Sequence, residues 1–203
     1  MIKNLIFDFG KVLVDYDYEA FYLRFIPEQK KREALISFFN YDLQMIIDRE
    51  AKPFSAIMED MIAMHKDLEN EIHIFEEHYT EVVTEEIPGM RELLMKLKAE
   101  GYKLYGLTNW CSKVYTTMSQ FDIFKLLDGQ VISSEEKVIK PEPEIYQILF
   151  ERFGLKPEEC VFTDDREDNI EGGRSLGMKG IVFKNAKQYE KELREILDNQ
   201  INN

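Results

Sequence analysis

Polar side chains follow several short apolar segments of this chain, and their types could together transfer a phosphoryl group. The residues are Asp8, Thr108, Asn109, Lys140, Asp164 and Asp165. A carboxylate can attack phosphorus and carry the group as an acyl phosphate. Mg²⁺ prefers carboxylate and water oxygens, and a lysine stabilises the charge on phosphoryl oxygens. The set could supply a nucleophile, a metal site and a cation if the fold brings its members together.

The apolar segments have the length and composition of buried strands. They cover residues 4–9, 102–108, 129–133, 159–164 and 178–183. Strands that are apolar on both faces are typical of a parallel sheet covered by helices on both sides. Ligands of such sheets bind outside the carboxyl ends of the strands, so we expect the polar residues to meet in one crevice.

Helical patterns alternate with these segments in the second half of the chain. Apolar residues recur at helical spacing in residues 90–100, 143–153, 169–176 and 188–197, and a glycine follows each of the first three patterns. Strands that alternate with helices predict right-handed βαβ units. We therefore expect an α/β fold with a Rossmann-like, doubly wound parallel sheet.

The stretch from residue 16 to residue 86 has a different pattern. It carries no strand signal, and its segments 30–39, 54–65 and 70–83 suit the helices of a small bundle. Because it follows the first strand directly, it is predicted to form an α-helical cap over the carboxyl end of that strand. The expected division is a core of residues 1–16 and 87–203 and a cap of residues 17–86.

Charge and composition exclude several classes of function. The chain has 203 residues, a net charge of -13 and two distant cysteines, Cys111 and Cys160. Nucleic acids and anionic lipids require a cationic surface, and a disulfide framework or zinc site requires a different cysteine pattern. No segment approaches the roughly 20 apolar residues of a membrane span, and the apolar N-terminal run is too short for a secretory signal. We expect a cytoplasmic monomer or homodimer that binds neither nucleic acid nor membranes.

Four segments of the chain resemble the ordered motifs of the haloacid dehalogenase superfamily. These segments are FDFGKVLVD, GLTNW, VIKPEPEIY and VFTDDREDNIEGGRSLGM, and the resemblance extends over essentially the whole chain. Each motif is weak alone, whereas four in this order and spacing are specific. The resemblance is to the branch with a helical cap inserted after the first motif, and it implies an Mg²⁺-dependent hydrolase.

The resemblance implies a role for each matching residue. Asp8 matches the nucleophile. Thr108 matches the hydroxyl that hydrogen-bonds the phosphoryl group, and Asn109 lies beside it in the sequence. Lys140 matches the lysine that pairs with the nucleophile and with phosphoryl oxygens. The implied metal ligands are Asp8, the main-chain carbonyl of Gly10, Asp164 and Asp165, of which Asp164 binds directly or through water. The expected reaction is hydrolysis of a small phosphorylated metabolite through an aspartyl phosphate on Asp8.

Gly10 departs from the pattern of most phosphatases in the superfamily, which have a second aspartate there as general acid and base. Proton transfer by such a group is typically worth about 10²–10⁴-fold in rate. A branch of α-D-glucose-1-phosphate phosphatases, which this chain also resembles, has glycine at the same place. An anomeric phosphate leaves more readily than an ordinary alkoxide, so Gly10 is compatible with a sugar 1-phosphate. Water, Asp15 or Asp17 could substitute for the missing acid.

Two other functions remain open from the sequence. Gly10 is also compatible with a non-catalytic or weakly active binding or regulatory protein. A haloacid dehalogenase likewise lacks the second aspartate, but it needs no metal, and the Asp164–Asp165 pair argues against it. Near the site, Trp110 is expected to pack at the entrance, and Asn169 is expected to tether backbone.

Overall fold

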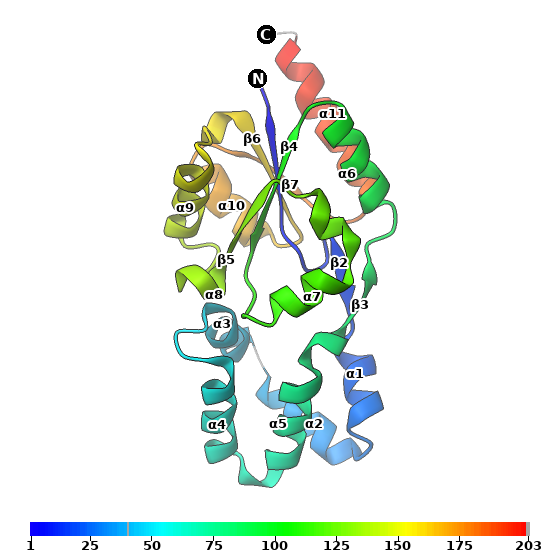
Figure 1. Ribbon diagram of the computed structural model, residues 1–203, viewed down its shortest axis with the longest axis vertical. Helices are drawn as coiled ribbons and strands as arrows, with labels where there is room; N and C mark the ends of the chain where they lie inside the picture. Colours follow the sequence, from blue (N-terminus) through cyan, green and yellow to red (C-terminus); the bar gives the residue numbers. More distant parts are fainter. Residues whose placement is uncertain (40, 202–203) are drawn as a thin grey trace.

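A parallel sheet of five strands forms one half of the protein. The computed structural model describes residues 1–39 and 41–201, and Figure 1 shows the sheet in its upper half. In spatial order the strands are β5 (Gly129–Ile132), β4 (Lys103–Thr108), β1 (Asn4–Phe7), β6 (Cys160–Asp164) and β7 (Lys179–Val182). All neighbouring pairs are parallel, and each strand lies within its predicted segment. The predicted α/β fold class is confirmed.

Helices cover both faces of this sheet. Because successive strand residues point to opposite faces, Leu5 and Phe7 pack into one buried cluster whereas Ile6 packs into a second. The first cluster includes side chains of α6 (Met90–Ala99) and α11 (Ala186–Ile201), and the second includes those of α9 (Pro143–Phe153) and α10 (Glu167–Ser175). The shorter elements of this half are α7 (Val114–Gln120), η3 (Asp122–Leu126), α8 (Ser133–Glu136) and η4 (Pro157–Glu159).

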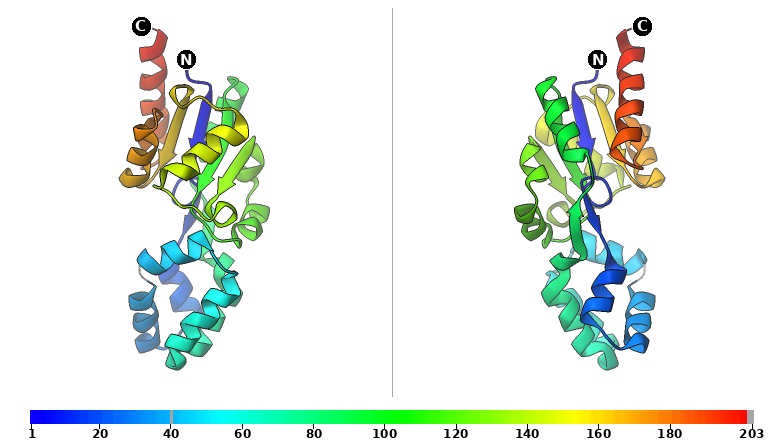
Figure 2. Two further views of the ribbon diagram at one scale, coloured as in Figure 1. Left: turned by 90° about the vertical axis from the view of Figure 1, so that its left-hand side faces the viewer. Right: turned by 90° about the vertical axis from the view of Figure 1, so that its right-hand side faces the viewer.

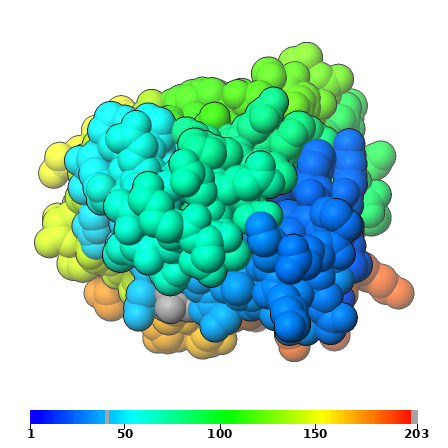
Figure 3. All heavy atoms as spheres, turned by 90° about the horizontal axis from the view of Figure 1, so that it is seen from below, coloured from blue at the N-terminus to red at the C-terminus, as the bar shows by residue number. Residues whose placement is uncertain are grey.

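A bundle of helices lies beyond the carboxyl ends of the strands, in the lower half of Figure 1. We call it the cap. Its elements are α1 (Tyr18–Phe25), α2 (Gln29–Phe38), α3 (Tyr41–Arg49), α4 (Phe54–Met64), η1 (Lys66–Leu68), α5 (Glu69–His78) and η2 (Tyr79–Val82). Seen from below, the cap covers most of that end of the molecule (Figure 3).

Two short antiparallel strands connect the sheet to the cap. They are β2 (Val14–Tyr16) and β3 (Val83–Glu86), and they run side by side between the two halves in Figure 2. The expectation that residues 16–86 contain no strand is therefore wrong for β3. Its sequence VTEE is short and mostly polar, and its pairing with a strand about seventy residues earlier in the chain leaves no local pattern to detect.

Polar contacts attach helix α3 of the cap to the sheet half. Arg49 forms an ion pair with Glu142, with Nη2 lying 2.5 Å from Oε1. The carboxylate of Glu50 accepts hydrogen bonds from the backbone N–H and the hydroxyl of Ser112, at 2.5 and 2.8 Å. The C-terminal end of α3 is therefore held against the loops that follow β4 and β5.

Among the described residues, no helix combines the length and the apolar composition that crossing a bilayer requires.

Candidate active site

Lys140 lies between two carboxylates at the carboxyl end of the sheet. Its ammonium nitrogen is 2.9 Å from Asp8 Oδ1 and 2.7 Å from Asp164 Oδ2, and it donates to the carbonyl of Leu107 at 2.9 Å. Burial lowers the pKa of Lys140, but the charges of Asp164 and Asp8 raise it above its usual range. The side chain is 1% exposed, so a permanent cation is held beside Asp8 without competition from water.

Asn109 positions Lys140 through its backbone. The Asn109 side-chain oxygen accepts from the Lys140 N–H at 2.7 Å, and its amide nitrogen donates to the Lys140 carbonyl at 3.0 Å. This two-point contact joins the end of β4 to the segment that carries the lysine. Asn109 thus supports the site in addition to lining its pocket.

Asp164 is buried and held by donors on several sides. Besides Lys140, it accepts from the Arg166 N–H at 2.9 Å and from the Asn169 amide at 3.0 and 3.1 Å. Asn169 therefore tethers a carboxylate rather than the backbone that the sequence suggested. Asp165, the next residue, is exposed and faces the pocket.

Three carboxylates converge closely enough to hold a cation. One oxygen each of Asp8, Asp164 and Asp165 lies within 4.8 Å of the others. Burial raises the pKa of Asp8 to about 7 against the opposing effect of Lys140, and the charge of Asp164 adds to the increase. Burial and the charge of Asp164 also raise the pKa of Asp165. A dication would relieve this repulsion, so the donor set fits a hard cation with oxygen ligands.

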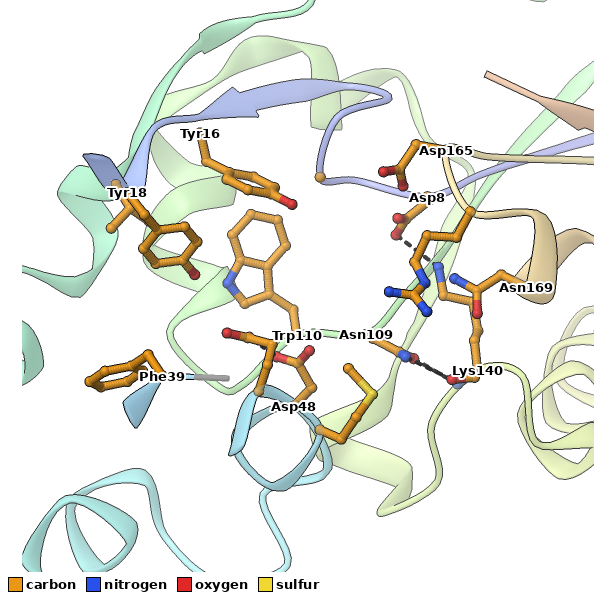
Figure 4. A pocket seen from close by; sticks show the side chains of 15 residues that line it. Asp8, Tyr16, Tyr18, Phe39, Asp48, Asn109, Trp110, Lys140, Asp165 and Asn169 are labelled. Atoms are coloured by element: carbon orange, nitrogen blue, oxygen red, sulfur yellow. Dashed lines mark hydrogen bonds and ion pairs between the residues drawn. The ribbon is translucent and has the colours of Figure 1, made fainter. Parts of the chain in front are cut away.

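These residues open into a pocket between the sheet and the cap (Figure 4). The pocket has a volume of about 390 Å³. Residues from the sheet half that line it are Asp8, Gly10, Asn109, Trp110, Lys140, Asp165, Arg166 and Asn169. The linker strand and the cap contribute Tyr16, Tyr18, Phe39, Gln44, Met45, Asp48 and Val82. The linker strand and the cap together therefore build about half of the wall that a ligand would contact.

The ring of Tyr16 lies where a side chain at position 10 would project. A Cβ atom built on Gly10 would be 3.0 Å from Tyr16 Cε1. Figure 4 shows the Tyr16 hydroxyl directed toward the Asp8 side of the pocket. Burial, followed by the charges of Asp165 and Asp8, raises the pKa of Tyr16 to about 12, so its hydroxyl remains protonated at neutral pH.

Residues 2–177 match the haloacid dehalogenase-like hydrolase family. The chain belongs to this family. It is 28% identical over 188 residues to a phosphorylated carbohydrates phosphatase of Thermotoga maritima, covering 89% of this chain and 84% of that protein. It is 34% identical over 110 residues to a glyceraldehyde 3-phosphate phosphatase of Pyrococcus furiosus, a match that covers 53% of this chain but only 46% of the relative.

Solved structures show the same fold. A haloacid dehalogenase family enzyme from Bacteroides thetaiotaomicron, solved as a magnesium complex, aligns with a TM-score of 0.77. The two are 21% identical, and the alignment covers 95% of this chain and 98% of the other. At this identity the likeness establishes the shared arrangement of sheet and cap.

Filling the space at Gly10 is expected to cost stability because of Tyr16. Gly10→Ala should lower the free energy of unfolding by about 1 kcal/mol, the lower end of the usual cost of overpacking. In a Tyr16→Ala background the same substitution should not lower the free energy of unfolding through this contact. Urea unfolding of the wild-type protein, the two single variants and the double variant would measure the difference. An equal cost in both backgrounds would mean that Tyr16 does not oppose a side chain at position 10.

Some residues suggested by the sequence lie away from the pocket. Thr108 ends β4 with 1% exposure and does not line the pocket, so its predicted contact with a phosphoryl group stays a prediction. Asp15 forms an ion pair with Lys11, and Asp17 accepts from the Ala20 N–H as the N-cap of α1. Neither aspartate is among the described residues that line the pocket, so the idea that one of them replaces the missing acid has no support from their positions.

The residues that sequence reasoning missed come mainly from the linker and the cap. Tyr16 and Asp48 are the polar examples with the clearest position in the pocket. Asp48 occurs in the segment IIDRE, where its acidic side chain has no local signal that separates it from the solvated acids of other helices. Only the docking of α3 on the loops beyond the sheet directs it inward.

Proposed function

We propose that this chain is an Mg²⁺-dependent phosphomonoesterase that acts on a small phosphorylated metabolite. The observation that carries the proposal is the position of Asp8, 2.9 Å from the buried ammonium of Lys140 and grouped with Asp164 and Asp165. A carboxylate beside a fixed cation and a metal site is suited to attack on a phosphate ester. A halide displacement would not need the acidic cluster.

Mg²⁺ would be held by Asp8, Asp165 and the Gly10 carbonyl, with Asp164 bound directly or through water. When bound, the ion supplies positive charge to phosphoryl oxygens and neutralises the acids that would otherwise repel an anionic ester. The Bacteroides enzyme with the same fold was also solved with magnesium and inorganic phosphate together. This supports the proposal that the present chain binds both Mg²⁺ and a phosphate group.

Each of the residues at the site has a separate role in the proposed reaction. The free oxygen of Asp8 attacks phosphorus in line while Lys140 stabilises the charge on the phosphoryl oxygens and orients the nucleophile. The P–O bond to the leaving group breaks, and an aspartyl phosphate remains on Asp8. Water then attacks phosphorus and releases inorganic phosphate. The cap, held over the pocket by α3, excludes bulk water and contacts the rest of the substrate.

A sugar phosphate such as glucose 1-phosphate is the proposed substrate. The pocket joins aromatic walls, including Tyr18 and Trp110, to polar groups that can hydrogen-bond hydroxyls, including Gln44 and Asn109. Its volume of about 390 Å³ suits a monosaccharide phosphate rather than a macromolecule. The Thermotoga and Pyrococcus relatives are both phosphatases of small phosphorylated carbohydrates by name, which favours the same substrate class.

The decisive experiment is a screen of sugar phosphates with Mg²⁺ in which phosphate release is measured. Turnover that disappears on chelation and returns with Mg²⁺ is expected. Activity that persists in chelator toward a haloacid would favour the dehalogenase alternative. Failure to hydrolyse even activated aryl phosphates would favour a non-catalytic binding protein.

Mg²⁺ affinity is expected to rise with pH up to about 7. Burial raises the pKa of Asp8 to about 7 in the metal-free protein, so below that pH the carboxyl group must lose a proton before it can bind metal. Calorimetric titrations in two buffers of different ionisation enthalpy should detect this proton release. Asp8→Asn should remove the released proton as well as weaken binding. An affinity that does not change between roughly pH 6 and 8 would contradict the assignment of Asp8 as a ligand.

A further inference from the structure

The pocket contains one carboxyl group that the proposed reaction has not used. Asp48 lies on cap helix α3, lines the same pocket as Asp8, and is 4% exposed. Figure 4 shows Asp48 at the cap side of the pocket, below Trp110, whereas Asp8 and Asp165 lie at the opposite side. A substrate whose phosphate contacts Asp8 would therefore extend its leaving group toward Asp48.

The position of Asp48 is fixed by contacts with the sheet half. The Ser133 hydroxyl donates to the Asp48 carbonyl at 2.5 Å. The next two residues, Arg49 and Glu50, pair with Glu142 and Ser112 as described above. An acid that is to transfer a proton must be held in one place, and these contacts hold this part of the cap against the sheet half.

The surroundings of Asp48 favour its neutral form. Of the described side chains, Gln44 donates to the carboxyl group, at 2.8 Å from Oδ1. Burial raises the pKa of Asp48 well above its ordinary value, and the negative charge of Asp8 raises this pKa further. The hydrogen bond from Gln44 and the positive charge of Lys140 act in the opposite direction. The other titratable groups that face it are Tyr16, Tyr18, Tyr79 and Cys111. A neutral carboxyl group in this place carries a proton that it can give away.

We propose that Asp48, delivered by the cap, is the general acid that protonates the leaving-group oxygen and so replaces the acid missing at Gly10. This inference rests on the proposed phosphatase function. As Asp8 attacks phosphorus, the P–O bond to the leaving group breaks and the departing oxygen takes the Asp48 proton, which gives an alcohol and the aspartyl phosphate. The water that attacks this intermediate returns a proton to the Asp48 carboxylate. Both protons are then accounted for when phosphate leaves.

Other candidates in the pocket fit the role less well. Lys140 is shared between Asp8 and Asp164, and loss of its proton would leave both carboxylates without their cation. The Tyr16 hydroxyl, whose pKa burial and acidic neighbours raise to about 12, is a much weaker acid than a carboxyl group. It is suited to donating a hydrogen bond. Because Asp48 reaches the pocket only with α3 docked, the reaction is coupled to closure of the cap.

Asp48→Asn tests the proposal with two esters that differ in their need for a proton. Asparagine keeps the size of the side chain and an oxygen for Gln44 but cannot act as an acid. Cleavage of glucose 1-phosphate should fall by roughly 10²-fold, the low end of the usual effect, because its anomeric oxygen leaves more readily than an ordinary alkoxide. The first release of nitrophenolate from 4-nitrophenyl phosphate, measured in the pre-steady state, should stay within several-fold because this leaving group departs without a proton. Asp42→Asn, at an exposed position of the same helix, should leave both rates unchanged.

The outcomes separate this proposal from the phosphatase assignment. The role of Asp48 would be overturned if Asp48→Asn lost the same activity toward both esters or lost none toward either. It would also be overturned if the wild-type protein cleaved only the aryl ester and not glucose 1-phosphate. In each of these cases Asp8 would remain the proposed nucleophile. If Tyr16→Phe lost activity toward glucose 1-phosphate alone and Asp48→Asn kept full activity, Tyr16 rather than Asp48 would be the general acid. If the wild-type protein with Mg²⁺ cleaves neither ester, the proposed function itself fails. Circular dichroism and thermal unfolding of each variant establish that it folds.

Discussion

Asp8→Asn is expected to reduce phosphatase turnover by roughly 10⁴-fold or more, as loss of a covalent nucleophile does in other enzymes. The amide keeps the shape of the side chain but cannot form an acyl phosphate. Folding should survive, because the substitution removes a buried charge whose pKa is already raised to about 7 by its surroundings. Phosphate release at saturating substrate and thermal unfolding would measure the two effects separately.

The aspartyl phosphate gives an independent readout of the same prediction. Acid-quenched wild-type protein should yield a phosphorylated peptide that contains Asp8, and the variant should not. Asp17→Asn is a matched control, since Asp17 caps α1 outside the pocket and asparagine is an equally good N-cap. Retained turnover in Asp8→Asn, or phosphate trapped on another residue, would refute the nucleophile assignment.

Lys140→Met is expected to damage both catalysis and stability. It removes the cation that contacts Asp8 at 2.9 Å and Asp164 at 2.7 Å and leaves two buried carboxylates without it. Breaking a buried ion pair by removing one partner typically costs roughly 3–5 kcal/mol. Loss of a positioned electrostatic donor typically costs about 10²–10³-fold in turnover. Urea unfolding and steady-state kinetics would measure these two losses.

The pH dependence of the Lys140 variant has a defined sign. Lys140 lowers the pKa of Asp8, so its removal should raise that pKa further and move the onset of activity and of Mg²⁺ binding to higher pH. Lys179→Met, which changes an exposed lysine of β7, should leave stability, turnover and pH profile unchanged. An unchanged pH profile in Lys140→Met would show that the lysine does not control the charge of Asp8.

Arginine is not expected to rescue position 140. The ammonium of Lys140 reaches three acceptors, Asp8, Asp164 and the Leu107 carbonyl, from a side chain with 1% exposure. A planar, larger guanidinium has no room to contact all three from the same point. Lys140→Arg should therefore lose turnover although it keeps the charge, which would separate the geometric requirement from the electrostatic one.

The cap does more than cover this site, because its contacts also position part of the pocket wall. The contacts of Arg49 and Glu50 with the sheet half place the C-terminal turn of α3 beside the proposed catalytic residues. Glu50 has a φ of 45°, which is unfavourable for a residue with a side chain, and its hydrogen bonds to Ser112 offset that cost. Strain of this kind persists only where surrounding contacts hold the backbone, and here those contacts join the two halves of the protein.

The sheet and the position of its polar residues follow from the sequence because both depend on local patterns. A short apolar run bounded by turn residues favours a strand that is covered on both faces, and the residue after such a strand lies at its carboxyl end. For this reason the sequence alone predicts that Asp8, Asn109 and Asp165 lie in one crevice. Glycines after helices, such as Gly154 with a φ of 63°, likewise mark where α9 must end.

The tertiary structure decided what local patterns do not encode. Three features depend on segments that are distant in the chain or on how the cap docks. They are the pairing of β2 with β3, the position of the Tyr16 ring in front of Gly10, and the inward direction of Asp48. An acidic residue on an amphipathic helix has the same sequence signal whether it faces water or a pocket. The sequence alone could therefore propose Asp8 as the nucleophile, whereas the candidate acid became visible only with the cap packed over the carboxyl ends of the strands.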